Sequence, residues 1–334
     1  MDFEKFVKKV KDGAQAYLGD GVSLSVSTVL KNNGVNLTGI IFMDGDSDVA
    51  STIYLDGLYE EYKRGKTMGE IVRQVCTVYE ENKPEQNLNM DFFHDYKMVK
   101  PRLACRLINC EKNQELLGGH PHREFLDLAI VYCCILMSDN MGCACVLISD
   151  MHARYWDVDE ETLYRDALEN MPRILPDELS DMDDFMHDIV RKAVEEKLEL
   201  TAEGEKTQED EECRAILDGI AEFLAGLPLE KEPERKMYIL TNKQHFYGAA
   251  AILYPGILES YAGKLGHDFY ILPSSVHEVI LLADTGVEDR EHLYDMVREV
   301  NAQNVPEEEL LSDNVYYFSL KSGKITILSV SYTH

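Results

Sequence analysis

Apolar residues in the first half of the chain follow two spacings, one typical of helices and one typical of strands. Asp2–Leu18 has the helical period, whereas Val22–Leu30 and Val35–Met43 alternate between apolar and polar residues. Between these two strands lies Asn32-Asn33-Gly34, a turn sequence that tolerates positive φ, so the pattern predicts a hairpin. We expect further helices at Thr52–Arg64, Thr67–Asn82 and Glu160–Asn170, and further strands at Arg102–Asn109, Phe125–Met137 and Gly142–Ser149.

Beyond Pro176 the pattern changes to a narrow apolar stripe within an acidic segment. Apolar residues recur every three or four positions across Glu178–Leu198, a spacing suited to a helix that packs along another helix. The polar stretch Thr201–Glu212 separates this helix from a second amphipathic helix, which we expect at Ile216–Leu224. The stretch from residue 177 to 235 is therefore interpreted as an acidic helical connector.

A strand, a helix and a second strand are expected between Met237 and Asp284. Pro255 removes one backbone donor from the expected helix at Tyr247–Leu265, so this helix should be kinked there. The remaining elements are a helix and a terminal hairpin, expected at Glu288–Asn301, Val315–Leu320 and Lys324–Leu328.

Short hairpin connections, rather than long crossovers, link most of the expected strands, and this favours antiparallel sheets. We therefore predict an α+β fold with two mainly antiparallel-sheet lobes and packed helices. The N-terminal lobe would cover residues 1–176 and the C-terminal lobe residues 236–330. The acidic helical connector at residues 177–235 would join them.

The net charge of −28 is unevenly distributed along the chain. Asp157–Arg235 contains 26 acidic and nine basic residues, so this segment carries −17 of the total. Negative charge repels phosphate backbones, which argues against direct nucleic-acid binding. The same segment could instead mimic DNA and occupy a basic partner.

The pattern contains neither a membrane span nor a secretory signal. The longest apolar run, Leu128–Met137, has ten residues, about half of a membrane span. Charged residues occur throughout the N-terminal segment, which lacks the apolar core of a signal peptide. Most of the eight cysteines lie between Cys105 and Cys145 in apolar runs, as expected for reduced thiols. We expect a cytoplasmic protein that does not bind membranes.

Four polar residues interrupt the apolar pattern of the C-terminal half, and we name them the polar cluster: Ser274, Ser275, His277 and Glu278. Apolar runs on both sides should draw them into the sheet, where unpaired polar groups are costly. On a strand, Ser275 and His277 would share a face, and these are residue types that hydrolases use. With two polar residues of the preceding strand and loop, they form the first candidate site: Asn242, His245, Ser274, Ser275, His277 and Glu278.

A second candidate site gathers residue types that bind metals: His120, His122, Asp127 and His152. Zinc requires three or four converging ligands, and Cys143 and Cys145 could add thiols from one strand face. No Cys-x-x-Cys pair accompanies them, and we expect the histidine pair in a turn before the next strand. The sequence contains no complete phosphate-binding motif of the Gly-x-Gly-x-x-Gly or P-loop type. We predict neither a bound metal nor a cofactor.

Short motifs spread over most of the chain carry a family resemblance: Asn32-Asn33-Gly34, Thr52-Ile53-Tyr54-Leu55, Leu107-Ile108-Asn109, Ala167-x-x-Asn170, Thr241-Asn242, Gly248-Ala249-Ala250, Ile271–Glu278 and Leu311-Ser312-Asp313. Together they resemble a bacterial domain-of-unknown-function family, number 5688. The resemblance implies a cytoplasmic bacterial protein. It implies no activity, ligand or catalytic residue.

Three functions remain open from the sequence. The incomplete catalytic motifs, the acidic segment and the two amphipathic helices favour a non-enzymatic protein-interaction or regulatory module whose partner is another protein. The first alternative is a hydrolase-type enzyme that uses the Ser275 and His277 region, which would require a third polar partner beside them. The second is an acidic DNA mimic that inhibits a nucleic-acid enzyme. An interaction module should expose an apolar patch on the acidic helical connector.

Overall fold

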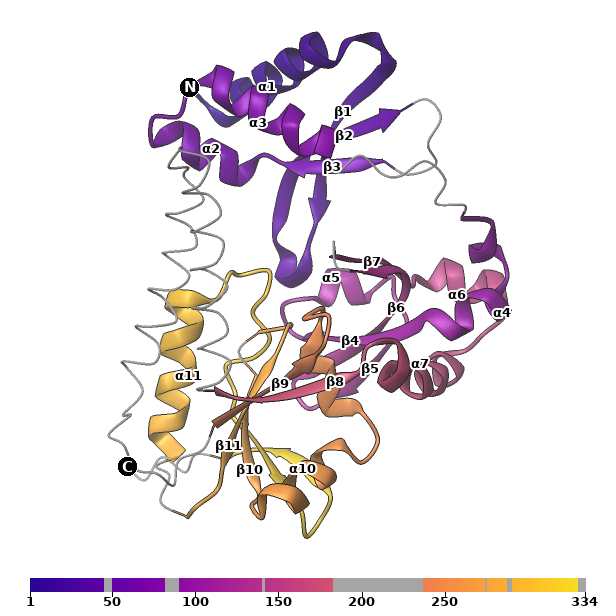
Figure 1. Ribbon diagram of the computed structural model, residues 1–334, viewed down its shortest axis with the longest axis vertical. Coiled ribbons are helices and arrows are strands. Elements are labelled where there is room, and N and C mark those ends of the chain that lie inside the picture. Colours follow the sequence, from indigo (N-terminus) through magenta and orange to yellow (C-terminus); the bar gives the residue numbers. More distant parts are fainter. Residues whose placement is uncertain are drawn as a thin grey trace, which may run out of the picture. The chain divides into compact units, whose positions relative to one another are not determined.

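The computed structural model describes residues 1–44, 50–81, 90–139, 142–182, 237–273, 275–286 and 290–329 (Figure 1). Throughout these ranges the strands pair in antiparallel sheets and helices pack against them, so the predicted α+β fold is confirmed. Contacts divide the chain into two units, Met1–Met98 and Val99–His334. No helix in the described ranges is both long enough and apolar enough to cross a membrane.

In the N-terminal unit, helices and a three-stranded sheet share one apolar core. Helix α1 (Phe3–Leu18) begins at Asp2, whose carboxylate accepts a hydrogen bond from the Lys5 amide (2.9 Å). Residues of α1 at intervals of one turn pack against the sheet and against the later helices. The sheet has the order β1 (Val22–Leu30), β2 (Asn36–Asp44), β3 (Ser51–Tyr54), and the later helices are α2 (Asp56–Lys63) and α3 (Met68–Glu81).

The β1–β2 hairpin forms as predicted, because Asn33 and Gly34 adopt φ angles of 59° and 73°. The prediction of a helix from Thr52 was wrong for its first residues. Thr52 and Ile53 pair with β2 as part of β3, and their β-branched side chains favour a strand. Helix α2 begins only at Asp56, after the fully buried Leu55.

The C-terminal unit begins with a four-stranded sheet built around β6 (Leu128–Asp139). One edge of β6 pairs with β4 (Leu103–Asn109), and the other pairs with β5 (His122–Phe125) and β7 (Gly142–Leu147). The predicted strand Phe125–Met137 was wrong at its start, because a tight turn at Leu126 (φ 59°) and Asp127 separates β5 from β6. The short helices of this unit are η4 (Lys100–Arg102), α5 (Gln114–Leu117) and α6 (Asp150–Trp156), and η3 (Met90–His94) and α4 (Tyr96–Val99) precede them in the chain.

A six-stranded antiparallel sheet completes the C-terminal unit. Its order is β13 (Lys324–Ile327), β12 (Tyr316–Ser319), β10 (Phe269–Leu272), β11 (Val279–Ala283), β9 (Met237–Asn242), β8 (Asp177–Asp181). Helix α11 (Arg290–Asn304) packs on this sheet through Leu293, Tyr294 and Val297. The helix predicted at Tyr247–Leu265 consists of two separate pieces, η5 (Gly248–Leu253) and α10 (Ile257–Leu265), because Pro255 and Gly256 (φ 73°) interrupt it completely.

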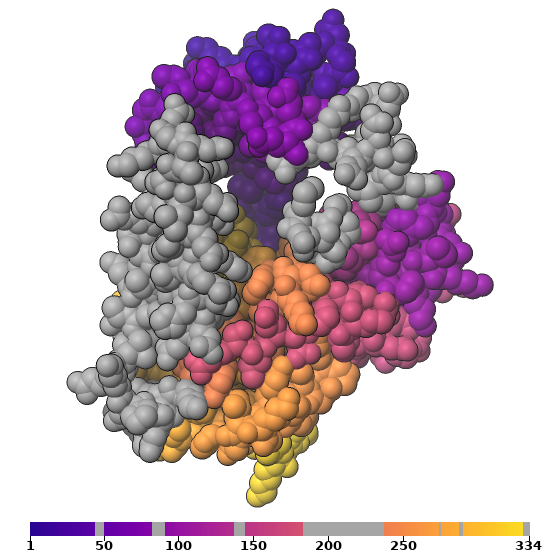
Figure 2. Space-filling view, in the orientation of Figure 1, coloured from indigo at the N-terminus to yellow at the C-terminus, as the bar shows by residue number. Residues whose placement is uncertain are grey.

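The division of the chain at Met98 differs from the predicted lobes at residues 1–176 and 236–330. Both sheets beyond Val99 belong to one unit, because η5 packs against β4 and β8 pairs with β9. The helix predicted from Glu178 was wrong at its start, since Asp177–Asp181 form an edge strand, which adjoins the later, orange residues at the surface (Figure 2). The rest of the predicted connector, residues 183–235, lies outside the described residues.

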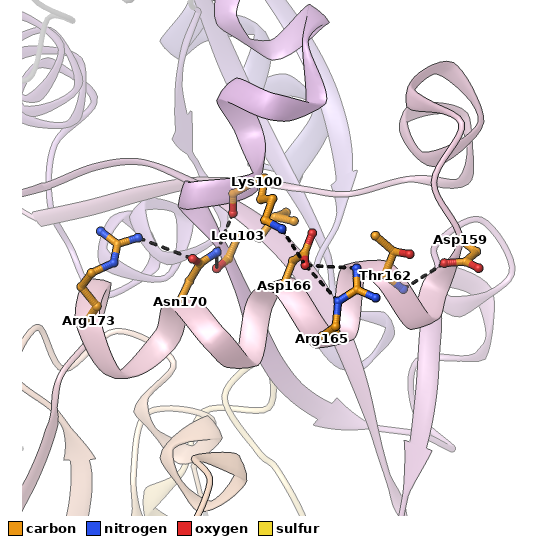
Figure 3. Close-up of polar contacts among 8 residues, drawn as sticks. All are labelled: Lys100, Leu103, Asp159, Thr162, Arg165, Asp166, Asn170 and Arg173. Atoms are coloured by element: carbon orange, nitrogen blue, oxygen red, sulfur yellow. Dashed lines mark hydrogen bonds and ion pairs between the residues drawn. The ribbon is translucent and has the colours of Figure 1, made fainter.

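Polar contacts tie α7 (Glu160–Ile174) to the segment that precedes β4 (Figure 3). The buried Asn170 amide donates hydrogen bonds to the carbonyl groups of Lys100 and Leu103. One turn earlier, the Asp166 carboxylate, only 1% exposed, forms ion pairs with Lys100 Nζ (3.1 Å) and Arg165 Nε (3.3 Å). These contacts satisfy the buried Asp166 carboxylate and the carbonyl group of the buried Leu103.

Replacing Asn170 by Ala should lower the free energy of unfolding by about 1–3 kcal/mol, because the carbonyl groups of the buried Leu103 and of Lys100 lose a donor. Chemical denaturation of the full chain measures this change. Glu169→Ala is the matched control on the exposed side of the same helix, and it should change stability by less than about 0.5 kcal/mol. Equal effects of the two substitutions would contradict the role assigned to Asn170.

Candidate functional site

Asn242, at the end of β9, organises the loop that follows it. Its side chain is 1% exposed, and Oδ1 accepts hydrogen bonds from the backbone amides of Gln244 (3.2 Å) and Phe246 (3.1 Å). Its Nδ2 donates to the Phe246 carbonyl (2.8 Å). Within this loop His245 and Tyr247 adopt positive φ angles of 50° and 48°. Such angles are unfavourable for bulky residues, so the surrounding contacts must hold the loop in place.

Gly248 allows this loop to approach the polar cluster closely. A Cβ atom at residue 248 would lie 2.1 Å from Thr241 Oγ1 and 2.4 Å from the His277 carbonyl oxygen. No side chain fits there, so glycine is required for close backbone approach. Thr241 Oγ1 donates to the same His277 carbonyl (2.8 Å) and joins β9 to the polar cluster.

The polar cluster is hydrogen-bonded in its described members, as the sequence predicts, but it is a loop and not a strand. Ser275 is 6% exposed, and its Oγ accepts a hydrogen bond from the His277 backbone amide (3.0 Å). The His277 imidazole lies with Nδ1 at 3.2 Å from the His245 carbonyl. Burial raises the pKa of Glu278, although His277 and a hydrogen bond from Ser275 oppose the shift. Ser274 lies outside the described residues.

The prediction that Ser275 and His277 share one face of a strand was wrong. The segment between β10 and β11 does not alternate as a strand, and Ser275 forms only an isolated bridge with Leu310. Among the hydrogen bonds of the described residues, Ser275 Oγ contacts the backbone of His277 and not its ring. The structure therefore brings Asn242, His245, Ser275, His277 and Glu278 together mainly through backbone contacts.

An aromatic and cationic stack lies beside the polar cluster and was missed from the sequence. The Arg106 guanidinium of β4 lies 3.4 Å from the centre of the Tyr247 ring, and this ring stacks on His277 with centroids 5.4 Å apart. Arg106 Nε is buried without a hydrogen-bond partner. The signal in the sequence was a single arginine within the otherwise apolar strand Leu103–Ile108.

Two thiols lie beside this stack. Cys133 of β6 and Cys145 of β7 form a side-chain hydrogen bond. This bond and the positive charge of Arg106 lower the pKa of the Cys145 thiol to about 7, against the opposing effect of burial. The same bond, together with burial, raises the pKa of Cys133. The side chain of Cys143 lies outside the described residues.

The second candidate site separates into two parts. His120 Nδ1 lies 2.7 Å from the Leu116 carbonyl oxygen. His122 Nδ1 lies 2.8 Å from the His120 carbonyl oxygen. The expectation that both lie in a turn was wrong for His122, which begins β5. His152 Nδ1 accepts from the Ser149 amide (3.1 Å) and caps α6, and burial and the nearby His120 lower its pKa.

Asp127 lies beyond the other end of β5 and has a different role. Its carboxylate accepts hydrogen bonds from Ser312 Oγ (2.6 Å), Asn314 Nδ2 (2.9 Å) and the Tyr316 hydroxyl (2.6 Å). These contacts join the four-stranded sheet to the six-stranded sheet. In the described part of the chain, no group of three or more His, Cys, Asp or Glu side chains is arranged to hold a metal ion.

Helix α6 presents large side chains to the solvent on the side away from the buried Ala153. Met151 is 74% exposed and Tyr155 is 67% exposed, and the two residues are one helical turn apart. We name this pair the α6 surface. The sequence predicted an apolar patch elsewhere, on the amphipathic helices of the acidic connector. Most of that connector lies outside the described residues.

One family model, described as a family of unknown function (DUF5688), matches residues 3–320. This span includes every residue of both candidate sites. No curated protein and no solved structure matches the chain.

Gly248→Ala should destabilise the protein by about 1–3 kcal/mol, because the added Cβ overlaps Thr241 Oγ1 and the His277 carbonyl. Gly263→Ala in α10 is the matched control, since nothing lies within 4 Å of its added Cβ, and it should be neutral or stabilise by about 0.4–1 kcal/mol. Thermal unfolding of both variants measures the difference. The same sign for both substitutions would refute the close approach at Gly248.

Proposed function

The chain belongs to the DUF5688 family of unknown function, and on that premise we propose that it is a non-enzymatic regulatory module that binds another protein. The observation that carries this proposal is the α6 surface, where Met151 and Tyr155 are 74% and 67% exposed. A tyrosine and a flexible methionine one turn apart are residue types that are enriched where proteins dock.

The partner is a different protein and not a second copy of this chain. Each copy carries a net charge of −28, so two copies repel each other at moderate ionic strength. A partner with an apolar contact face and a neutral or basic surface would avoid this repulsion. Arg154, on the same helix, is 79% exposed in its side chain and interacts with Asp150 only at 3.8 Å, which leaves it accessible at the edge of the α6 surface.

The contacts of Ser275 favour this proposal over the hydrolase alternative. A serine nucleophile requires a base within hydrogen-bond distance and an exposed position. Ser275 Oγ is instead buried, accepts a hydrogen bond from the His277 amide and donates one to Glu278. The His277 ring faces the His245 carbonyl and, at 3.9 Å, Glu309, and not Ser275. This arrangement suits a structural network.

We also propose a cytoplasmic location for the protein. The free thiols at the described cysteines support this location. The DNA-mimic alternative depends mainly on residues 183–235, which lie outside the described residues, and no contact described above favours it.

Replacing both Met151 and Tyr155 by Asp should abolish partner binding while the fold is retained, because both side chains are exposed. The measurement is affinity purification of the tagged full chain from extracts of the source organism, followed by titration of the captured protein. We expect at least a tenfold loss of affinity, which corresponds to about 1.4 kcal/mol.

Leu320→Asp is the matched control, since Leu320 is an exposed apolar residue of the same unit outside α6. This variant should bind the partner as the unchanged protein does. If the wild-type chain captures no protein, or if the double variant captures the same protein equally well, the proposal is wrong.

A further inference from the structure

Cys133 and Cys145 lie on the same face of the four-stranded sheet. Cys133 is opposite Leu147, and Cys145 is opposite Ile135, so the two cysteines are diagonal neighbours on adjacent antiparallel strands. Their thiols are joined by a hydrogen bond. The Cys110 thiol has different surroundings, since it accepts a hydrogen bond from Gln114 Nε2 (3.7 Å) and packs against the apolar cluster that includes Ile108.

Arg106 reaches this face from the opposite edge of β6. Cys133 pairs with Ala104 on β4, and Arg106 lies two residues further along on the same face. The guanidinium donates a hydrogen bond to Cys145 and is held from the other side by the Tyr247 ring at 3.4 Å. Cationic surroundings and partial exposure are the conditions under which a thiol becomes reactive, and Cys145 meets both.

We propose that Cys133 and Cys145 are a redox-reactive pair, in which Cys145 reacts with hydroperoxides and Cys133 then closes a disulfide. This modification site is independent of the α6 surface. Neither Cys133 nor Arg106 has a role in the hydrolase or metal hypotheses.

The reaction proceeds in two balanced steps. The Cys145 thiolate attacks one oxygen of the hydroperoxide, the O–O bond breaks, and Cys145 becomes a sulfenic acid while the leaving oxygen departs as hydroxide or alkoxide. The Cys133 thiol then attacks the Cys145 sulfur, its proton goes to the leaving hydroxyl, and water is released with the disulfide. The hydroperoxide is reduced by two electrons, which the two thiols supply.

The strand geometry separates the two steps. Diagonal neighbours on adjacent strands are further apart than the Cα–Cα distances that a relaxed disulfide spans, so closing the bond requires a backbone adjustment. β7 permits this adjustment because it is an edge strand, and its pairing with β6 already contains an irregularity between Ile135 and Met137. We expect fast formation of the sulfenic acid and slower closure of the disulfide.

The test treats the full chain with hydrogen peroxide and follows the product by intact mass and peptide mapping. We expect a loss of about 2 Da with a disulfide between Cys133 and Cys145. Cys145→Ser should abolish the reaction, Cys133→Ser should leave a sulfenic acid at Cys145 that dimedone traps, and Cys110→Ser should change nothing. A disulfide between other cysteines, or oxidation of Cys110 as fast as Cys145, would overturn the proposal.

The relative alkylation rates of Cys145 and Cys110 in the unchanged protein provide a second test. Alkylation by iodoacetamide at pH 7 should label Cys145 well before Cys110, and the midpoint of its pH–rate profile should lie near the pKa of about 7. Arg106→Gln should move this midpoint to higher pH. The rate at pH 7 should fall roughly fivefold, because the lost thiolate fraction is partly offset by higher intrinsic nucleophilicity. An unchanged midpoint in a folded Arg106→Gln protein would contradict the role of Arg106.

Discussion

The close approach at Gly248 is the constraint on which the candidate site depends. Because this residue has no Cβ, the Thr241 hydroxyl and the His277 carbonyl meet beside its backbone, and β9 is joined to the loop before β11. The chain then enters η5, which packs against β4 of the other sheet. In the preceding loop His245 and Tyr247 adopt left-handed backbone angles, and the Tyr247 ring lies against Arg106.

Polar contacts at a second point join the two sheets of the C-terminal unit. The Asp127 carboxylate binds Ser312, Asn314 and Tyr316, and Asn109 donates to the Leu311 carbonyl (3.0 Å). Satisfied networks of this kind are rigid, whereas unpaired buried polar groups would be costly. The least constrained part of the site is β7, an edge strand that continues through Ile148 and Ser149 into α6.

The sequence predicted the elements whose signals are local. The turn at Asn33 and Gly34 needed only the φ preference of its own residues, and the start of α3 needed only Thr67 and Glu70, which cap each other at 2.8 and 3.3 Å. The sequence did not predict the elements whose structure depends on pairing with a distant strand. Ser51–Tyr54 and Asp177–Asp181 became edge strands because β2 and β9 offered them partners, which no spacing within either segment reveals.

In the candidate site, too, local features could be predicted from the sequence and long-range contacts could not. Burial and hydrogen bonding of Ser275 could be predicted from the apolar runs around it, but the contact it makes with the His277 backbone could not. The Arg106 stack was missed because its partners, Tyr247 and Cys145, are distant in the sequence and are assembled only by the packing of two sheets. Asp127 was grouped with the histidines on residue type alone, and the turn at Leu126 directs it to the opposite end of β5.

The hydrogen bonds of the loop after β9 and of the polar cluster connect them, and we expect them to behave as one rigid structural framework. Residue-resolved amide hydrogen exchange checks this rigidity, because it measures the free energy of local opening. The amides of Phe246 and His277, held by Asn242 Oδ1 and Ser275 Oγ, should exchange as slowly as those of β9 and β11. Fast exchange at these two amides, with the strands still protected, would contradict the claim.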